Sequence, residues 1–136
     1  MYAVAVKRDF KAQHYLIGGN WGEENVLHTH HYCVELQLRG RELDRYGYLT
    51  DIAEIESLLD ARVHYYQDRT LNDLPEFSGL NPSIERFAFV LCKAFVDTIK
   101  ATTVHIVTAK VWESDIAWAS YTYITPGTAQ DILPEL

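Results

Sequence analysis

Alternating apolar and polar positions predict strands at both ends of the chain. The segment from about Tyr2 to Tyr15 alternates, and His28 to Leu38 does so most clearly, with its odd positions polar or small. We expect these two segments to pair as an antiparallel ladder. Two more strands are predicted near Val104–Ser114 and Ala117–Ile124, with a short turn between them. The apolar face of the clearest strand consists of Tyr32, Val34, Leu36 and Leu38.

The middle of the chain has helical spacing instead. One helix is predicted from Asp51, with Glu54 three residues later as a possible capping box. A second is predicted with Asn81 as its cap and Pro82 at the first helical position. The stretch between them, from His64 to Leu80, is expected to be irregular. The predicted buried stripes are Ile52, Ile55, Leu58, Leu59 and Val63 in the first helix, and Ile84, Phe87, Leu91, Phe95 and Ile99 in the second.

The predicted order β-β-α-α-β-β indicates an α+β fold. Two helices would cover one face of a four-stranded antiparallel sheet. A chain of 136 residues is long enough to bury a core as one domain. We expect a single domain over 1–125 and a C-terminal tail over 126–136, where the pattern fades.

Composition excludes several classes of partner. The net charge is −7 and no run of Lys or Arg occurs, so we expect no nucleic-acid partner. No apolar run approaches the roughly 20 residues that span a bilayer, so we expect no membrane partner. The two cysteines make no disulfide framework, and the N-terminus has no secretory signal. A cytoplasmic location is the expectation.

Three histidines suggest a metal centre. His28 and His30 are two apart on a predicted strand, so their rings project from one face, and His14 lies near the end of the neighbouring strand. Three neutral imidazoles form a familiar Zn²⁺ set whose fourth position stays open for water or substrate. The alternative is that His-x-His marks two ordinary surface histidines, and spacing alone does not decide between them.

At these residues the chain resembles the family of 6-pyruvoyl-tetrahydropterin synthase and 6-carboxytetrahydropterin synthase. Six landmarks occur in the family's order, between residues 5 and 123, although the spacing of the first is shifted. They are Phe10-Lys11-Ala12-Gln13-His14, Leu27-His28-Thr29-His30-His31-Tyr32, Gly47-Tyr48-Leu49-Thr50-Asp51-Ile52, Leu71-Asn72, Asn81-Pro82-Ser83-Ile84-Glu85 and Glu113-Ser114.

The resemblance implies zinc at His14, His28 and His30, and the tunnelling fold (T-fold). It also implies a homo-oligomer, a hexamer built as a dimer of trimers, with active sites between subunits. The substrate would be a small-molecule pterin. Glu113 would anchor its ring by accepting two hydrogen bonds.

By the same resemblance, Ser83 and Glu85 would contact the pterin ring from the start of the second helix. Other interpretations stay open for two of these positions. Glu85 could simply be a first-turn acid favoured by the helix dipole. Glu113 could be an exposed acid beside a hairpin turn.

The chain departs from the family at the acid–base positions. Glu24 stands where a catalytic Cys commonly precedes the first metal histidine. Gln67 and Asp68 replace the family's Asp-His pair. Glu24 and Asp68 are therefore our candidates for proton transfer, with Glu24 as a general base if burial raises its pKa. Glu23 and Glu24 could also be solvated loop acids.

Three hypotheses follow. The first is a zinc-dependent lyase or synthase acting on the side chain of a dihydropterin such as dihydroneopterin triphosphate. A branch of the family with Glu in place of Cys, which cleaves that side chain to a 6-hydroxymethyl pterin, fits Glu24 but leaves the lost Asp-His pair unexplained. The second is a paralogue that binds zinc and a pterin-like ligand without this turnover. The third is a zinc hydrolase that has no need of Glu113.

Overall fold

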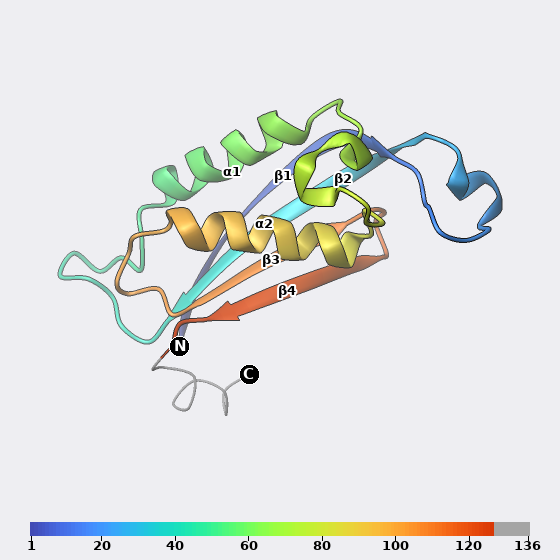
Figure 1. Ribbon diagram of the computed structural model, residues 1–136. Helices are drawn as coiled ribbons and strands as arrows, with labels where there is room; N and C mark the ends of the chain where they lie inside the picture. The colour runs from blue at the N-terminus through green and yellow to red at the C-terminus, as the bar shows by residue number, and fades with distance from the viewer. Residues whose placement is uncertain (127–136) are drawn as a thin grey trace.

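The computed structural model describes residues 1–126 and confirms the predicted β-β-α-α-β-β order. Most of the predicted tail, 126–136, lies outside the described residues. Three short 3₁₀ helices accompany the main elements (Figure 1). The elements are β1 (Tyr2–His14), η1 (Gly22–Asn25), β2 (His28–Gly40), α1 (Ile52–Tyr66), η2 (Leu71–Asp73), η3 (Pro75–Phe77), α2 (Ile84–Thr98), β3 (Ile106–Trp112) and β4 (Trp118–Ile124).

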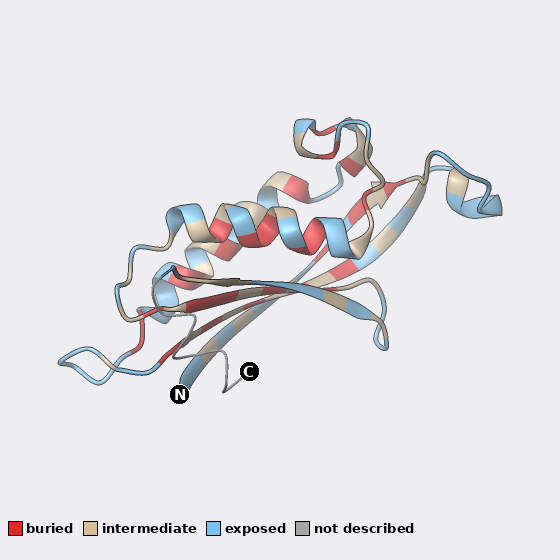
Figure 2. Cartoon of the chain, turned by 60° about the horizontal axis from the view of Figure 1, so that its bottom comes forward, coloured by how far each residue is buried: buried red, intermediate tan, exposed pale blue. Residues whose placement is uncertain are grey.

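The four strands form one antiparallel sheet in the order β1-β2-β3-β4, and both helices cover the same face of it. Helix α1 packs on β1, while α2 packs on β3 and β4. Buried residues lie between the helices and the sheet, and none of the helices within residues 1–126 covers the opposite face, called the uncovered face below (Figure 2). This arrangement is the α+β fold that the sequence pattern predicted, and it is the T-fold that the family resemblance implied. Its largest fully buried side chains are Tyr32, Tyr66, Phe77, Phe87 and Phe95.

The strands β1 and β2 extend beyond the rest of the sheet. They pair along their whole length, from Tyr2 opposite Gly40 to His14 opposite His28. Strand β3 pairs with β2 only from Cys33 to Arg39. The first half of β2 and the second half of β1 therefore form a two-stranded ribbon at one end of the molecule. This ribbon carries all three predicted zinc ligands.

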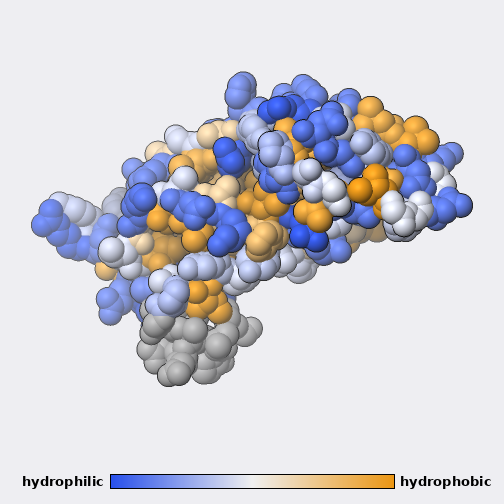
Figure 3. All heavy atoms as spheres, viewed as in Figure 1, coloured by the Kyte–Doolittle hydropathy of each residue, from blue (hydrophilic) through white to orange (hydrophobic). Residues whose placement is uncertain are grey.

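The loop that joins β1 to β2 contains apolar side chains at its surface. Val26 is 66% exposed and Leu27 is 51% exposed. In Figure 3 orange spheres gather at the right-hand end of the molecule, where Figure 1 draws this loop in blue. Within residues 1–126, none of the helices is both long enough and apolar enough to cross a bilayer.

Helix α1 begins where the sequence predicted. Asp51 is its N-cap and accepts a hydrogen bond from the backbone N–H of Ala53 at 3.0 Å. The prediction was wrong at two points, one in the apolar stripe and one at the end of the helix, because 64–66 were expected to be irregular. Ile52 is 46% exposed because it precedes the part of the helix that packs on the sheet, and the helix continues to Tyr66, whose side chain is fully buried.

Helix α2 begins two residues later than predicted. Ser83, and not Asn81, is its N-cap, and the Ser83 hydroxyl accepts from the N–H of Arg86 at 3.1 Å. The Asn81 amide bonds instead to the backbone of Ile17, which accounts for the difference. A capping pattern in the sequence cannot show that a distant segment competes for the same side chain.

Candidate metal centre and adjoining pocket

The ribbon brings the three predicted histidines together. Their ring centroids form a nearly equilateral triangle with sides of 4.6, 4.7 and 4.8 Å. His14 and His28 are direct partners in the ladder, and His30 lies two residues further along β2, on the same face. Side-chain alternation thus places all three rings on the face covered by the helices. His31 points to the other face and is exposed.

Hydrogen bonds fix the tautomers of two rings. His14 Nδ1 lies 3.0 Å from the carbonyl oxygen of Pro82, and His28 Nδ1 lies 2.7 Å from that of Val26. A carbonyl can only accept, so each Nδ1 carries the proton. In the neutral ring, each Nε2 then holds a lone pair, as a metal ligand requires.

His14 is the most buried member of the set. It is 4% exposed, and its Nε2 has no hydrogen-bond partner. Burial lowers the pKa of His14 from 6.5 to about 4, and the neighbouring His30 and His28 add to this effect, although the Pro82 carbonyl opposes it. The ring is therefore neutral at pH 7. A buried lone pair without a donor is what a cation would satisfy.

Glu24 joins the three rings. Its Oε2 lies 2.9 Å from His28 Nε2, and His28 Nε2 lies 3.1 Å from His30 Nε2. One candidate ligand atom from each of the four residues lies within 4.8 Å of the others. Three imidazoles and a carboxylate are donors that suit Zn²⁺. The residues present therefore fit a zinc ion. Three of them were predicted from the sequence as zinc ligands, and Glu24 as a candidate for proton transfer.

A pocket of about 330 Å³ opens beside this cluster. Its lining joins predicted metal ligands to predicted substrate-binding residues, at the point where the ribbon meets the start of α2. The lining residues are His14, Leu16, Glu24, His30, Ser83, Ile84, Glu85 and Glu113. A volume of this size suits a small ligand.

The three predicted pterin-binding residues lie on two sides of this pocket. Ser83 is the N-cap of α2, and Glu85 lies in its first turn. Glu113 follows β3, and its backbone N–H donates to the carbonyl of Ala117 across the β3–β4 turn at 3.3 Å. The Ser83 oxygen is occupied by its capping bond, but its O–H is still available to donate.

Asp68 is the predicted site residue that lies in neither the pocket lining nor the histidine–carboxylate cluster. It follows α1, is exposed, and has a φ of 61°, a left-handed conformation that Asp tolerates. Its backbone N–H donates to the carbonyl of Lys11 at 2.7 Å. It is absent from the pocket lining and from the ligand cluster.

The side chains of three asparagines form hydrogen bonds with the backbone of the segment that follows β1. These bonds were not predicted from the sequence. Asn72 bonds to both the N–H and the carbonyl of Tyr15, at 3.0 and 2.9 Å. Asn81 does the same for Ile17, at 2.7 and 3.1 Å. From the other side, Asn25 donates to the carbonyl of Leu16 at 2.9 Å. These side chains satisfy backbone groups that a neighbouring strand would otherwise pair. The only signal in the sequence was that Asn72 and Asn81 belong to the family landmarks.

Neither cysteine belongs to the site. Cys33 lies on the uncovered face of the sheet, because it alternates with the buried Tyr32 and Val34. Burial, and then its hydrogen bond with Asp9, raise the pKa of the Cys33 thiol to about 11. Cys92 is buried in the core, and its pKa is also raised to about 11 by burial. Both thiols are protonated at neutral pH, so neither replaces a catalytic thiolate.

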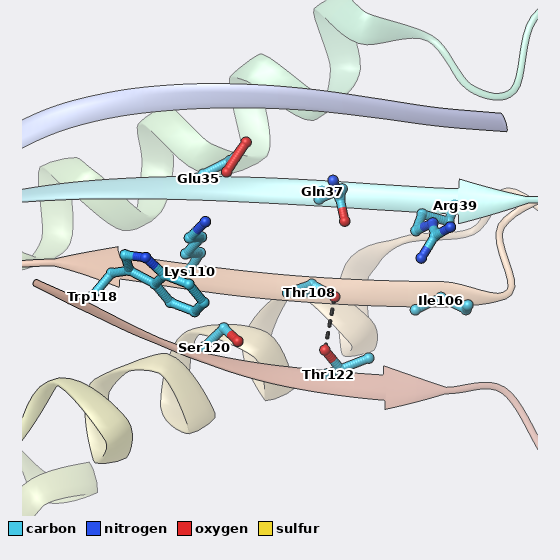
Figure 4. Close-up of a pocket in the computed structure, with 9 residues that line it drawn as sticks. All are labelled: Glu35, Gln37, Arg39, Ile106, Thr108, Lys110, Trp118, Ser120 and Thr122. Carbon is cyan, nitrogen blue, oxygen red and sulfur yellow. Dashed lines mark hydrogen bonds between the residues drawn. The ribbon is translucent and has the colours of Figure 1, made fainter. Parts of the chain in front are cut away.

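The uncovered face of the sheet has a separate hollow of about 260 Å³ (Figure 4). It is lined by side chains that alternate with core residues along β2, β3 and β4, among them Glu35, Lys110 and Trp118. Thr108 and Thr122 face each other there, with their hydroxyl oxygens 2.9 Å apart. None of the predicted site residues lines this hollow.

The fold and the site define a small α+β protein with a histidine–carboxylate centre beside a ligand pocket. The family model for 6-pyruvoyl tetrahydropterin synthase matches residues 3–123, and the chain belongs to that family. A search of curated protein sequences gives no match.

Solved structures agree on the fold. The Plasmodium falciparum 6-pyruvoyl tetrahydropterin synthase has a TM-score of 0.77 at 16% identity, over 90% of this chain and 98% of that one. The Caenorhabditis elegans synthase has a TM-score of 0.74 at 20% identity, over 90% and 97%. A Plasmodium vivax variant, in which a glutamate described as the catalytic residue is replaced by alanine, has a TM-score of 0.76 at 15% identity, over 90% and 98%.

Proposed function

We propose that this protein is a zinc-dependent lyase or synthase that acts on the side chain of a dihydropterin, such as dihydroneopterin triphosphate. One observation carries the proposal. A single pocket is lined by His14, His30 and Glu24 on one side and by Ser83, Glu85 and Glu113 on the other. The proposed reaction centre and the proposed ring-binding groups therefore lie next to each other. A substrate with a ring and a reactive side chain requires this arrangement.

Each side chain has a proposed role. His14, His28 and His30 would hold the zinc ion, which when bound acts as a Lewis acid toward a substrate oxygen. Glu113 would accept two hydrogen bonds from the pterin ring and so orient it. Ser83 and Glu85 would bind the same ring from the start of α2.

Glu24 would transfer the proton. Its carboxylate lies at the boundary between the metal cluster and the pocket, within reach of a substrate side chain there. The catalytic glutamate of the similar P. vivax protein supports a carboxylate in this role. Asp68 does not line the pocket of its own chain. Any part that it plays in proton transfer would therefore be at the pocket of a neighbouring subunit.

We also propose that the protein is a homo-oligomer, a hexamer built as a dimer of trimers. In the ladders formed by the described residues, β4 pairs along one edge only, and the outer edge of β1 is bonded only at Lys11 and Gln13, to the backbone of 68–70. Both ends of the sheet therefore have backbone groups available for another chain. Edge-to-edge pairing of β1 with a neighbour's β4 would extend the sheet.

The deciding experiment incubates zinc-loaded protein with dihydroneopterin triphosphate and identifies products by mass spectrometry. A 6-carboxy, 6-pyruvoyl or 6-hydroxymethyl product supports the proposal and identifies the branch. Glu24→Ala should then lower turnover by about 100-fold or more, as expected for loss of a general base. Glu113→Ala should weaken pterin binding.

The second candidate is a paralogue that binds zinc and a pterin-like ligand without this turnover. The altered acid–base positions, with Asp68 outside the pocket of its own chain, favour it. Binding that is lost in Glu113→Ala, with no product from any dihydropterin, would establish this function. Hydrolysis of model esters without pterin binding would point instead to a zinc hydrolase.

A further inference from the structure

Glu24 lies too close to His28 for two acceptors with nothing between them. His28 Nδ1 donates to the carbonyl of Val26, so its Nε2 holds a lone pair in the neutral ring. That lone pair faces Glu24 Oε2 at 2.9 Å and His30 Nε2 at 3.1 Å. The lone pair and the Glu24 carboxylate are both acceptors, which repel each other unless a cation or a proton lies between them.

The spacing suits a metal ion. Tetrahedral zinc has bonds of about 2.0–2.2 Å to nitrogen and oxygen, which places neighbouring ligand atoms roughly 3.3 Å apart. The two measured separations are close to this value, and all four atoms lie within 4.8 Å of one another. His14 Nε2, which has no hydrogen-bond partner, is the remaining candidate ligand atom.

The backbone of Glu24 is fixed against the ribbon. Its carbonyl accepts from the N–H of Leu16 at 2.9 Å, and its own N–H donates to the carbonyl of Trp21 at 3.3 Å. Asn25, the next residue, binds the carbonyls of Leu16 and Gly19. The side chain beyond this anchor is 53% exposed, and its carboxylate contacts His28. The carboxylate is thus delivered to the cluster by an ordered loop but is not enclosed there.

We propose that Glu24 is the fourth ligand of the metal centre, which closes a three-histidine, one-carboxylate set until substrate binds. This inference rests on the zinc ion of the proposed function and deepens the role of Glu24 in it. Substrate entering the pocket would displace the carboxylate from the three histidines. The displaced carboxylate would then lie beside the substrate, unpaired and able to accept a proton. The base would become available only when substrate is present.

The test measures zinc affinity without any pterin. Wild type, Glu24→Gln and Glu23→Gln are titrated with zinc in competition with a chromophoric chelator. Glu23 is the matched control, because it removes the same charge from the same 3₁₀ helix and lies outside the cluster. We expect Glu24→Gln to weaken zinc binding by about 10–100-fold, with Glu23→Gln within about twofold of wild type.

A second measurement reads the coordination directly. Cobalt(II) replaces zinc, and its visible absorption distinguishes a four-coordinate carboxylate-bound site from one completed by water. Glu24→Gln should change the spectrum and Glu23→Gln should not. Unchanged affinity and spectrum in Glu24→Gln, in a variant whose circular dichroism matches wild type, would overturn the proposal. Equal weakening by both variants would also overturn it, since only loop charge would then matter.

The experiments distinguish failure of the Glu24 ligand assignment from failure of the proposed pterin function. If Glu24→Gln weakens zinc binding but no dihydropterin binds, the ligand assignment stands and the pterin assignment does not. If dihydropterins are converted while Glu24→Gln keeps its zinc affinity, the reverse holds. In wild type loaded with cobalt, adding a dihydropterin should alter the spectrum as the carboxylate leaves. A spectrum unaffected by a dihydropterin that demonstrably binds would contradict the displacement.

Discussion

The position of one proton decides what the His14 ring can do. The Pro82 carbonyl holds that proton on Nδ1, and burial keeps a second proton off Nε2, so the lone pair stays available at neutral pH. The same burial has an effect on the protein without metal, because the unfolded chain has no such constraint on the ring. Local chemistry and folding stability are therefore linked through a single imidazole.

The metal-free protein should lose stability as the pH falls from 6.5 toward 4. The pKa of His14 is lowered from 6.5 to about 4 on folding, so the unfolded chain binds the proton more readily in this range. The full loss attributable to His14 is about 3 kcal/mol in the free energy of unfolding. Urea denaturation of chelator-stripped protein at pH 7.5 and 4.5 measures it.

His14→Gln should reduce this pH dependence, and His31→Gln should not, because His31 is exposed on the opposite face of the ribbon. Equal pH dependence in wild type and His14→Gln would show that the ring is not kept neutral by folding.

Individual residues show which parts of the site could be predicted from the sequence. His28 and His30 were predicted to share a face because strand alternation depends only on sequence spacing. Glu24 was predicted by its position before the histidines, but its place on η1 was not. The cap of α2 was misassigned, because helix capping rules are local and the Asn81 amide binds a segment 64 positions earlier. No local pattern contains a partner that far away.

At the scale of elements, the site depends on how the segment after β1 is held. Residues 15–17 continue the direction of β1 without a neighbouring strand, and asparagine side chains satisfy their backbone groups instead. Glu24 bonds to the middle of this segment through Leu16. Loss of the Asn81 bonds to Ile17, near the start of α2, should therefore shift the backbone of Leu16 and with it the Glu24 carboxylate.

Asn81→Ala should destabilise the protein and loosen the metal centre together. It removes two hydrogen bonds to Ile17 and leaves part-buried backbone groups without partners, a cost of about 1–3 kcal/mol. Asn20→Ala is the matched control, because its side chain makes only a local bond to Gly22 at 3.2 Å in an exposed turn.

Thermal unfolding and zinc titration of both Asn variants check this prediction. Zinc affinity that falls in Asn81→Ala and returns in Asn81→Asp, which keeps the acceptor for the N–H of Ile17, would show positioning. If zinc affinity is the same as in wild type while stability falls, the asparagine serves the fold alone.

At the scale of the whole molecule, we expect the outer edges of the sheet to determine the state of assembly, namely β4 and the part of β1 before Lys11, which have no neighbouring strand within residues 1–126. In β4 the odd positions face β3, since Thr125 N–H donates to His105 and the Ala117 carbonyl accepts from Glu113. By alternation, the backbone groups of Ser120 point away from the sheet. They are available to a strand of another copy.

Ser120→Pro should dissociate the oligomer without unfolding the chain. Proline removes an outward N–H and leaves the β3–β4 ladder intact, as tolerated at an edge. Ser120→Thr keeps the N–H and is the control. Light scattering after size-exclusion chromatography should give a large assembly for wild type and Ser120→Thr, and a smaller one for Ser120→Pro. A wild-type monomer would contradict the assembly that we propose.

The order in which the metal centre forms follows from where its parts lie in the chain. His14, Glu24, His28 and His30 all belong to residues 14–30, whereas the carbonyl that orients His14 belongs to Pro82. Closing so short a loop costs little entropy. A chain emerging from the ribosome therefore contains all four candidate ligands long before Pro82, whose carbonyl sets the His14 tautomer, is made. An ion bound at that stage would cross-link the β1–β2 hairpin. The Pro82 carbonyl, once it packs against His14, would then strengthen the binding of the ion.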